Sequence, residues 1–305
     1  KTLVESYSGS RDDEKLKDMI LRLYSFSMSG PWPEVWLNEK AEEFNINTVS
    51  ELDKTEWINV LRSNLAVELN GFINMMNKAI EIIKETDGLE PYLETFTTEL
   101  SYLDNAYASL SSGLEEMYKA FKLISFGRIP VVRKNKVSDE NAQATVKGVR
   151  DSIKKKLAKL IDDSFTFTPE EAVEGIKRVY PCMKTLANIT LEFASRFTQK
   201  KRDKNLLDFN DLEHLCLKIL ISKDEDGNIG PSQVAEHFRE YFDEVLVDEY
   251  QDSNNVQETI IDLLSRKSLD PPNVFMVGDV KQSIYRFRQA KPELFLDKYN
   301  RYPLE

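Results

Sequence analysis

Apolar residues recur every three or four positions through the first two thirds of the chain, which is the spacing of one helix face. The clearest stripe occupies residues 57–83. It ends just before Gly88 and Pro91, because glycine readily takes the left-handed cap and proline cannot continue a helix. A second stripe occupies residues 96–121. The sequence therefore predicts two long helices, which lie antiparallel because the link between them is short.

Two more helical stripes follow an irregular, basic stretch over residues 127–141. The first, over 149–160, has a lysine-rich outer face, and the second covers 173–197. Pro181 lies inside the second stripe and is expected to bend that helix. The polar segment "TQKKRDKN", residues 198–205, is the predicted domain boundary.

Beyond this boundary the pattern changes from helices alone to helices and strands. Asp208 is a suitable N-cap for an amphipathic helix. Two short apolar runs, 244–248 and 274–279, flank a helical pattern over about 255–266. A strand, a helix and a strand with continuous apolar runs are typical of a parallel sheet covered on both faces. We therefore predict a mostly α fold with a partial α/β core, divided into residues 1–200 and 201–305.

Composition is that of an ordinary globular protein. The 305 residues are 41% hydrophobic and 30% charged, which suits one large domain or two smaller ones. No apolar run approaches the roughly 20 residues of a membrane helix, so no membrane association is expected. Two cysteines are too few for a disulfide framework and favour a reducing, cytoplasmic location.

The charge is unevenly distributed. The formal net charge is −11, which by itself disfavours binding to a polyanion. However, residues 121–160 contain eleven lysines and arginines against three acids, a local net charge of +8. Lys154 and Lys155 are the central members of this run and are candidate DNA contacts. A solvated helix face explains the same pattern equally well.

The first strand ends in acids, in the sequence "EVLVDEYQDSNNVQ". Ligands of open α/β sheets bind beyond the carboxyl ends of the strands. Asp248 at that position can hold a hydrated magnesium ion, and Glu249 can orient and deprotonate a water that attacks a phosphoryl group. Acidic pairs also serve as helix caps and surface turns, so this motif alone is weak evidence.

The second strand adds a polar and aromatic segment. Gln282 follows its end, and a neutral amide there can hydrogen-bond a terminal phosphate. Tyr285, Phe287 and Arg288 come next, and alternating rings and guanidinium groups suit single-stranded nucleic acid. The alternative is that the two rings are core aromatics.

Together these segments resemble a known helicase class. "VDEYQD", the following "N..Q" and "VGDVKQSIYRFRQA" resemble motifs II and III of the UvrD/PcrA/RecB DNA helicases, and "LDFNDL" resembles the return from their helical insertion. "FMVGDVKQSIYRFRQAKPELFLDKY" and "LRLYSFSMSGPWPEVWL" resemble more narrowly the AddA (RexA) family of bacterial AddAB helicase–nucleases. The likeness covers essentially the whole chain.

The resemblance implies a role for each matching residue. It makes Asp248 the magnesium ligand and Glu249 the catalytic base. Gln282 becomes the γ-phosphate sensor. It also implies that Gln251 and Asp252 couple the acidic motif to its neighbours, and that Tyr285, Phe287 and Arg288 contact DNA bases and backbone. Many relatives carry tryptophan at position 287, and Gln289 replaces the glycine of simpler helicases.

The resemblance also implies the larger setting. Residues 1–200 correspond to a helical insertion, and 201–305 to the C-terminal part of a RecA-like (P-loop NTPase) motor domain. ATP and Mg²⁺ are the implied cofactors. The implied partners are single-stranded DNA, duplex ends and an AddB-type subunit forming a heterodimer, in double-strand-break repair in the bacterial cytoplasm.

A phosphate-binding loop is missing from these 305 residues. The pattern G-x-x-x-x-G-K-[ST] does not occur, and the exonuclease site implied by the resemblance does not occur either. We therefore expect a central fragment that does not hydrolyse ATP alone. Two alternatives remain: a stand-alone UvrD-like helicase, and a non-catalytic DNA-binding or partner-docking module whose acids are structural.

Overall fold

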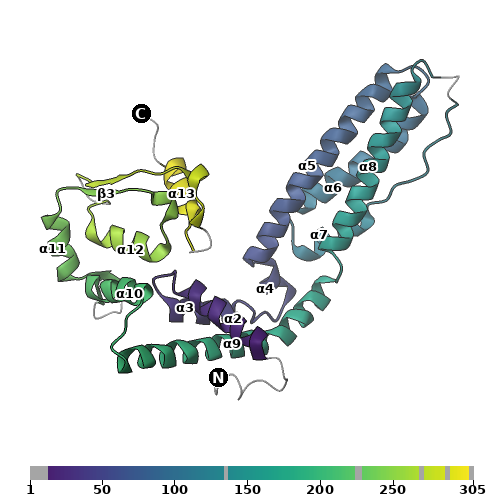
Figure 1. The fold of residues 1–305 in the computed structure, drawn as a ribbon. Helices are drawn as coiled ribbons and strands as arrows, with labels where there is room; N and C mark the ends of the chain where they lie inside the picture. The colour runs from purple at the N-terminus through teal and green to yellow at the C-terminus, as the bar shows by residue number, and fades with distance from the viewer. Residues whose placement is uncertain (1–12, 134–136, 224–228, 268–270, 286–288, 302–305) are drawn as a thin grey trace. The chain divides into compact units, whose positions relative to one another are not determined.

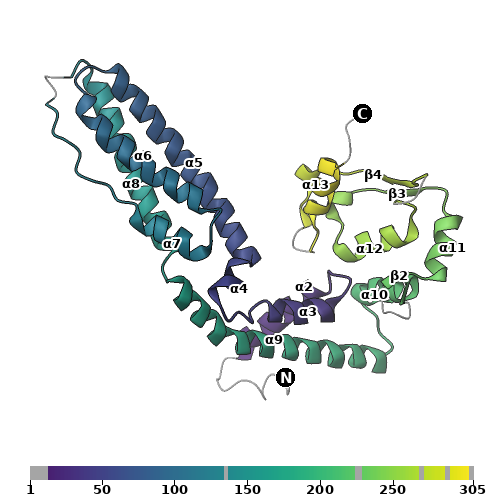
Figure 2. The same cartoon turned by 180° about the vertical axis from the view of Figure 1, so that it is seen from behind.

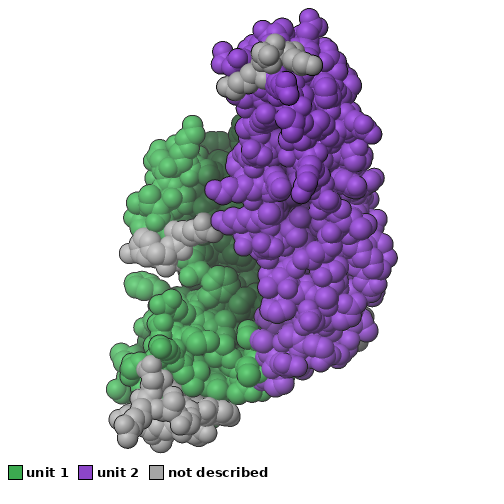
Figure 3. All heavy atoms as spheres, turned by 90° about the vertical axis from the view of Figure 1, so that its right-hand side faces the viewer, with its two compact units in different colours: residues 1–42, 182–305 green, residues 43–181 purple. Residues whose placement is uncertain are grey.

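The computed structural model describes residues 13–133, 137–223, 229–267, 271–285 and 289–301. The chain forms two compact units, which Figure 3 distinguishes by colour. One unit comprises residues 43–181, and the other comprises residues 1–42 and 182–305. This division by packing differs from the sequence boundary near residue 200, and the functional assignment of the two parts remains a prediction. No helix in the described ranges has the length and apolar character needed to cross a membrane.

The unit of residues 43–181 is helical, and α5, α6 and α8 lie side by side (Figure 1 and Figure 2). The long stripe over 57–83 is confirmed as a helix, because its positions provide the buried face of α5. Leu65, Phe96, Met117 and Ile153 are among the fully buried side chains of this core. The elements are α4 (Val49–Asp53), α5 (Glu56–Glu85), η1 (Glu90–Tyr92), α6 (Leu93–Ser109), α7 (Leu114–Leu123), α8 (Glu140–Ser164) and the first part of α9 (Pro169–Asp203).

The second stripe is two helices rather than the single one predicted. α6 ends at Ser109, and α7 begins after Gly113, whose extended backbone is the N-cap. Serine and glycine disfavour a helix interior, which explains the break at this point. The apolar spacing continues across it because both helices bury their stripes in the same core.

A buried ion pair fixes the irregular segment before α8. The Arg150 guanidinium donates to the Glu99 carboxylate, with Nε and Oε2 2.8 Å apart, and to the Gly127 carbonyl at 2.6 Å. Both side chains are almost completely buried. Arg150 therefore does not contribute to the exposed basic region, although the local count of charges included it.

The other unit contains the helix–strand region. Its elements are α2 (Asp13–Ser27), α3 (Pro33–Glu42), the rest of α9, α10 (Phe209–Leu220), β1 (Ile221–Lys223), β2 (Ile229–Pro231), α11 (Gln233–Tyr241), β3 (Val245–Val247), η3 (Tyr250–Asp252), α12 (Asn255–Leu264), β4 (Val274–Met276), η4 (Val280–Gln282) and α13 (Pro292–Arg301). The segment 198–205 is mostly helical, because α9 continues to Asp203.

The start of α10 is fixed by polar contacts. Asp208 caps the helix as predicted, in a capping box with Asp211. The Lys201 ammonium at the end of α9 donates to both carboxylates, at 2.7 Å each. Burial raises the pKa of Asp208, but hydrogen bonds from Lys201 and from the Asp211 backbone outweigh this, and the net shift of the pKa is downward.

β3 and β4 form the predicted parallel pair, with Val245 opposite Val274 and Val247 opposite Met276. In the centre of the register, Leu246 and Phe275 are directly opposed and are 69% and 62% exposed. The described part of this chain therefore covers one face of the sheet only, where two covered faces were predicted. An apolar run reports that a strand is suited to burial, but not whether the covering element lies in the same segment.

Candidate functional site

Asp248 and Glu249 follow directly after the last residue of β3, and both are exposed. The Glu249 backbone N–H donates to Asp248 Oδ1 at 2.8 Å. Glu249 itself is left-handed, with φ 50° and ψ 39°. A glutamate in that region costs about 1 kcal/mol, so the surrounding contacts must hold it there. The turn reverses the chain into η3 and leaves both carboxylates at the end of the strand.

The corresponding end of β4 lies beside these acids. Pairing continues beyond the strands, because Val277 N–H donates to the Val247 carbonyl and Tyr250 N–H donates to the Val277 carbonyl, each at 2.9 Å. Gly278 and Asp279 follow at once on the β4 side. The two predicted strand ends thus share one edge of one sheet.

Gln251 joins the two strand ends. Its side chain is buried, its Nε2 donates to Glu249 Oε2 at 2.6 Å, and its Oε1 accepts from the Asp279 backbone N–H at 2.9 Å. Gly278 makes room for this bridge, since a Cβ at that position would lie 2.4 Å from Gln251 Oε1. The carboxylate of Glu249 is consequently oriented by a buried amide that is itself fixed to β4.

Gln282 and Asp252 belong to the same edge. Gln282 is exposed on η4, and its amide donates to Asp279 Oδ2 at 3.1 Å. Ser283 Oγ donates to Asp252 Oδ1 at 3.4 Å. The residues proposed from the acidic motif and from the segment after β4 therefore form one connected polar group, whose catalytic roles remain predictions.

The predicted DNA contacts fall in two places. Tyr285 is 38% exposed just beyond η4, whereas Phe287 and Arg288 lie outside the described residues. Lys154 and Lys155 are exposed on α8, where the neighbouring Ile153 is buried. These lysines belong to the unit of residues 43–181 and the strand ends belong to the other unit.

The described residues include no group of three or more histidine, cysteine, aspartate or glutamate side chains placed to hold a metal ion. A divalent cation at this edge would rest on the single carboxylate of Asp248, and waters and phosphate oxygens would complete its shell. Mg²⁺ is bound in this way, through one or two carboxylates and substrate phosphates. The exposed position of Asp248 fits such an ion.

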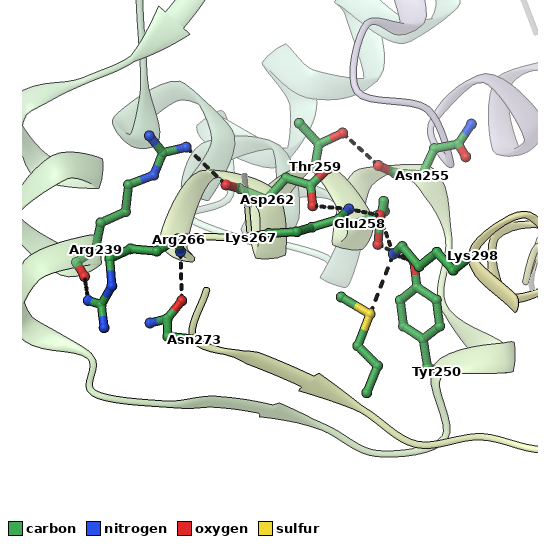
Figure 4. A network of polar contacts seen from close by, with 11 residues as sticks. Arg239, Tyr250, Asn255, Glu258, Thr259, Asp262, Arg266, Lys267, Asn273 and Lys298 are labelled. Carbon is green, nitrogen blue, oxygen red and sulfur yellow. Dashed lines mark hydrogen bonds and ion pairs between the residues drawn. The ribbon is translucent and has the colours of Figure 1, made fainter. Parts of the chain in front are cut away.

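A polar network behind the edge was not found from the sequence. Tyr250, Glu258, Lys267 and Lys298 converge there from η3, α12, the segment after α12 and α13 (Figure 4). Burial raises the pKa of the Glu258 carboxyl, but hydrogen bonds from Lys298, Tyr250 and Lys267 outweigh it and lower that pKa below its ordinary value. No local spacing relates residues 258 and 298, so only the fold brings them together.

Comparison with known proteins identifies the family. The model of the UvrD/REP helicase N-terminal domain matches residues 36–303, most of the chain. This chain therefore belongs to the UvrD/REP helicase N-terminal domain family.

Individual relatives narrow the likeness, and each is the A subunit of an ATP-dependent helicase/nuclease. The chain is 55% identical over 302 residues to the protein of Clostridium botulinum (strain Alaska E43 / Type E3), and 55% identical over 300 residues to that of Clostridium beijerinckii. It is 52% identical over 302 residues to the protein of Clostridium perfringens (strain 13 / Type A). These alignments cover 98–99% of this chain but 24% of each relative, so the chain spans about a quarter of their length.

Proposed function

We propose that this chain is part of the ATP-driven motor of a DNA helicase/nuclease. The observation that carries the proposal is the shared sheet edge, where Asp248, Glu249 and Gln282 are joined through Gln251 and Asp279. The names of the similar proteins, which are subunits of ATP-dependent helicase/nucleases, support the same function. In this proposal residues 201–305 belong to a RecA-like core and residues 1–200 to its helical insertion.

The chemistry proposed for the edge is hydrolysis of ATP. Asp248 would hold Mg²⁺, which neutralises the charge of the phosphates when it is bound. Glu249 would accept a hydrogen bond from the attacking water and take its proton, while the Gln251 amide keeps the carboxylate aimed. The Gln282 amide would contact the terminal phosphate and sense its loss.

The DNA-binding part of the proposal uses two surfaces. Tyr285, with Phe287 and Arg288, would stack on bases and meet phosphates of a single strand. Lys154 and Lys155 would contact the backbone of a duplex end. The further proposals, which rest on the relatives, are an AddB-type partner, an exonuclease site elsewhere in the full-length protein, and work in the bacterial cytoplasm.

The chain alone is not expected to hydrolyse ATP. The loop pattern that cradles phosphates is absent from the 305 residues, so ATP would lack most of its binding contacts. Turnover by the isolated chain, measured by phosphate release with DNA present, should stay at background. A DNA-stimulated rate above that level would contradict this part of the proposal.

Replacing the proposed base tests the function directly. In the full-length protein, Glu249→Gln should reduce ATPase activity about a hundredfold or more while ATP and DNA still bind, because only proton transfer and water orientation are lost. Glu244→Gln is the matched control, since Glu244 is exposed near the opposite end of β3. Unchanged ATPase activity in Glu249→Gln would favour the docking-module alternative.

A further inference from the structure

α13 is connected to the acidic motif through one lysine. Lys298 donates from its ammonium group to the Tyr250 hydroxyl and to Glu258 Oε1, and Met276 Sδ lies 3.5 Å away (Figure 4). The same ammonium lies 4.0 Å from the centroid of the Tyr250 ring. One side chain from α13 thus contacts η3, α12 and β4.

Glu258 is the acceptor at the centre of this network. It receives hydrogen bonds from Tyr250, from Lys267 at 2.9 Å and from Lys298. Lys267 also donates to Asp262 at 2.6 Å and so stays tied to α12 itself. Lys298 is the member that comes from another helix, and burial lowers its pKa more than Glu258 raises it.

Tyr250 carries the connection onward to the strand end. Its side chain is 1% exposed, and it stands between the left-handed Glu249 and the buried Gln251. Its backbone N–H is fixed to the Val277 carbonyl while its hydroxyl is held by the network. Because both ends of Tyr250 are held, the peptide on either side of it has little freedom to rotate.

We propose that Lys298 is a positioning residue for Glu249, and that it acts through Tyr250 and Glu258. The proposal rests on the proposed function of Glu249. Lys298 does not reach the strand end itself, so it would not bind ATP or move a proton. Its role would be to keep the strained backbone at Glu249 in one conformation, so that the carboxylate meets the attacking water in a single geometry.

α13 also follows the segment 283–291, where the proposed base-stacking residues lie, and it packs against η3 and η4. A displacement of that segment by DNA would therefore reach Lys298 first and the acidic motif second. Lys298 would then contribute to coupling between DNA binding and hydrolysis. A purely structural lysine would instead hold α13 in place without affecting turnover by correctly folded molecules.

The test compares four variants of the full-length protein in DNA-stimulated ATP hydrolysis. Lys298→Met removes the donor, Lys298→Arg retains one, and Tyr250→Phe removes only the hydroxyl. Arg301→Met is the matched control, because Arg301 is an exposed cation on the same helix. The fraction of molecules that bind a non-hydrolysable ATP analogue is measured for each, so that turnover is expressed per binding-competent molecule.

We expect Lys298→Met to lower kcat about tenfold or more per competent molecule with KM for ATP changed less than about twofold, which is the signature of lost transition-state positioning. Lys298→Arg should recover to within about threefold of wild type. Tyr250→Phe should lower kcat as well, and the double variant should be no worse than the poorer single one, because the two residues act as one unit.

Two results overturn the inference. One is an unchanged kcat per competent molecule in both Lys298→Met and Tyr250→Phe, with any loss confined to the competent fraction. The other is additive losses in the double variant. Both leave the proposed function standing as long as Glu249→Gln is inactive. If Glu249→Gln is active, the proposed function fails first. Tyr250→Phe keeps the test usable if Lys298→Met does not fold.

Discussion

At the scale of single residues, the site depends on Glu249, Gln251 and Gly278. Glu249 adopts a backbone conformation that glutamate disfavours, and the Gln251 amide holds its carboxylate. The absence of a side chain at Gly278 is what lets Gln251 approach the Asp279 backbone. Exposure of a carboxylate and its precise orientation are thus reconciled by one buried amide.

Adding a methyl group at Gly278 should disturb this arrangement. In Gly278→Ala the new Cβ would meet Gln251 Oε1 at 2.4 Å and Phe295 at 3.2 Å, so Gln251 must move away from Glu249. We expect ATPase activity of the full-length protein to fall about tenfold or more. The control is Gly71→Ala in α5, where a Cβ meets nothing within 4 Å and a helical alanine should stabilise by about 0.5–1 kcal/mol. Normal turnover in Gly278→Ala would show that Gln251 does not orient Glu249.

At the scale of elements, buried ion pairs join segments that are distant in the sequence. Arg150 of α8 pairs with Glu99 of α6 and so fixes Gly127 in the irregular segment between α7 and α8. Lys298 of α13 and Glu258 of α12 do the same beside β4. Removing one member of such a pair leaves an uncompensated charge, which costs more than the pair contributes.

The Glu258 network should make this region sensitive to acid. The folded pKa of Glu258 is lowered, so its ionised form stabilises the fold above its ordinary pKa of about 4.3, and this stabilisation is lost as the pH falls through the lower folded pKa. We expect Glu258→Gln to lower the melting temperature most at pH 6–7 and progressively less towards pH 3. Thermal unfolding of both forms across that range measures the difference. A difference that stayed constant with pH would show that ionisation of Glu258 contributes nothing.

At the scale of the whole molecule, the negative total charge conceals a basic helix. Lys154, Lys155 and Lys156 are consecutive and exposed on α8, while the chain as a whole carries −11. Local charge determines where a polyanion binds, so these lysines are the stronger guide to a DNA contact. The buried Arg150 shows that a count of cations overstates such a surface.

Reversing the three lysines to glutamate should weaken binding of the full-length protein to duplex DNA ends. Each phosphate contact contributes about 0.9 to the slope of log K against log salt concentration, so the slope should become shallower by up to about 3. Lys78, Lys84 and Lys119 are exposed on α5 and α7, and reversing them gives a control with the same change in charge. Equal effects of the two sets in a salt titration would assign the α8 lysines to a solvated face.

The sequence by itself determined the long helices, the capping of α10 by Asp208 and the parallel pairing of β3 with β4. These follow from short-range spacing, which fixes the face that an element buries and the residue where it begins. Serine and glycine could have revealed the break between α6 and α7, but the apolar stripe continued through it. The hairpin β1–β2 and α11 were not predicted, since both are too short to give a clear period.

Only the tertiary structure decided how the site is held. The bridge of Gln251 to Asp279, the space at Gly278 and the reach of Lys298 to Tyr250 each join residues 27 to 48 positions apart. It also placed Arg150 in the core and left Leu246 and Phe275 exposed, although both strands are apolar. Periodicity records which face of an element is apolar, whereas partners distant in the sequence are chosen by packing, and packing exists only once the chain has folded.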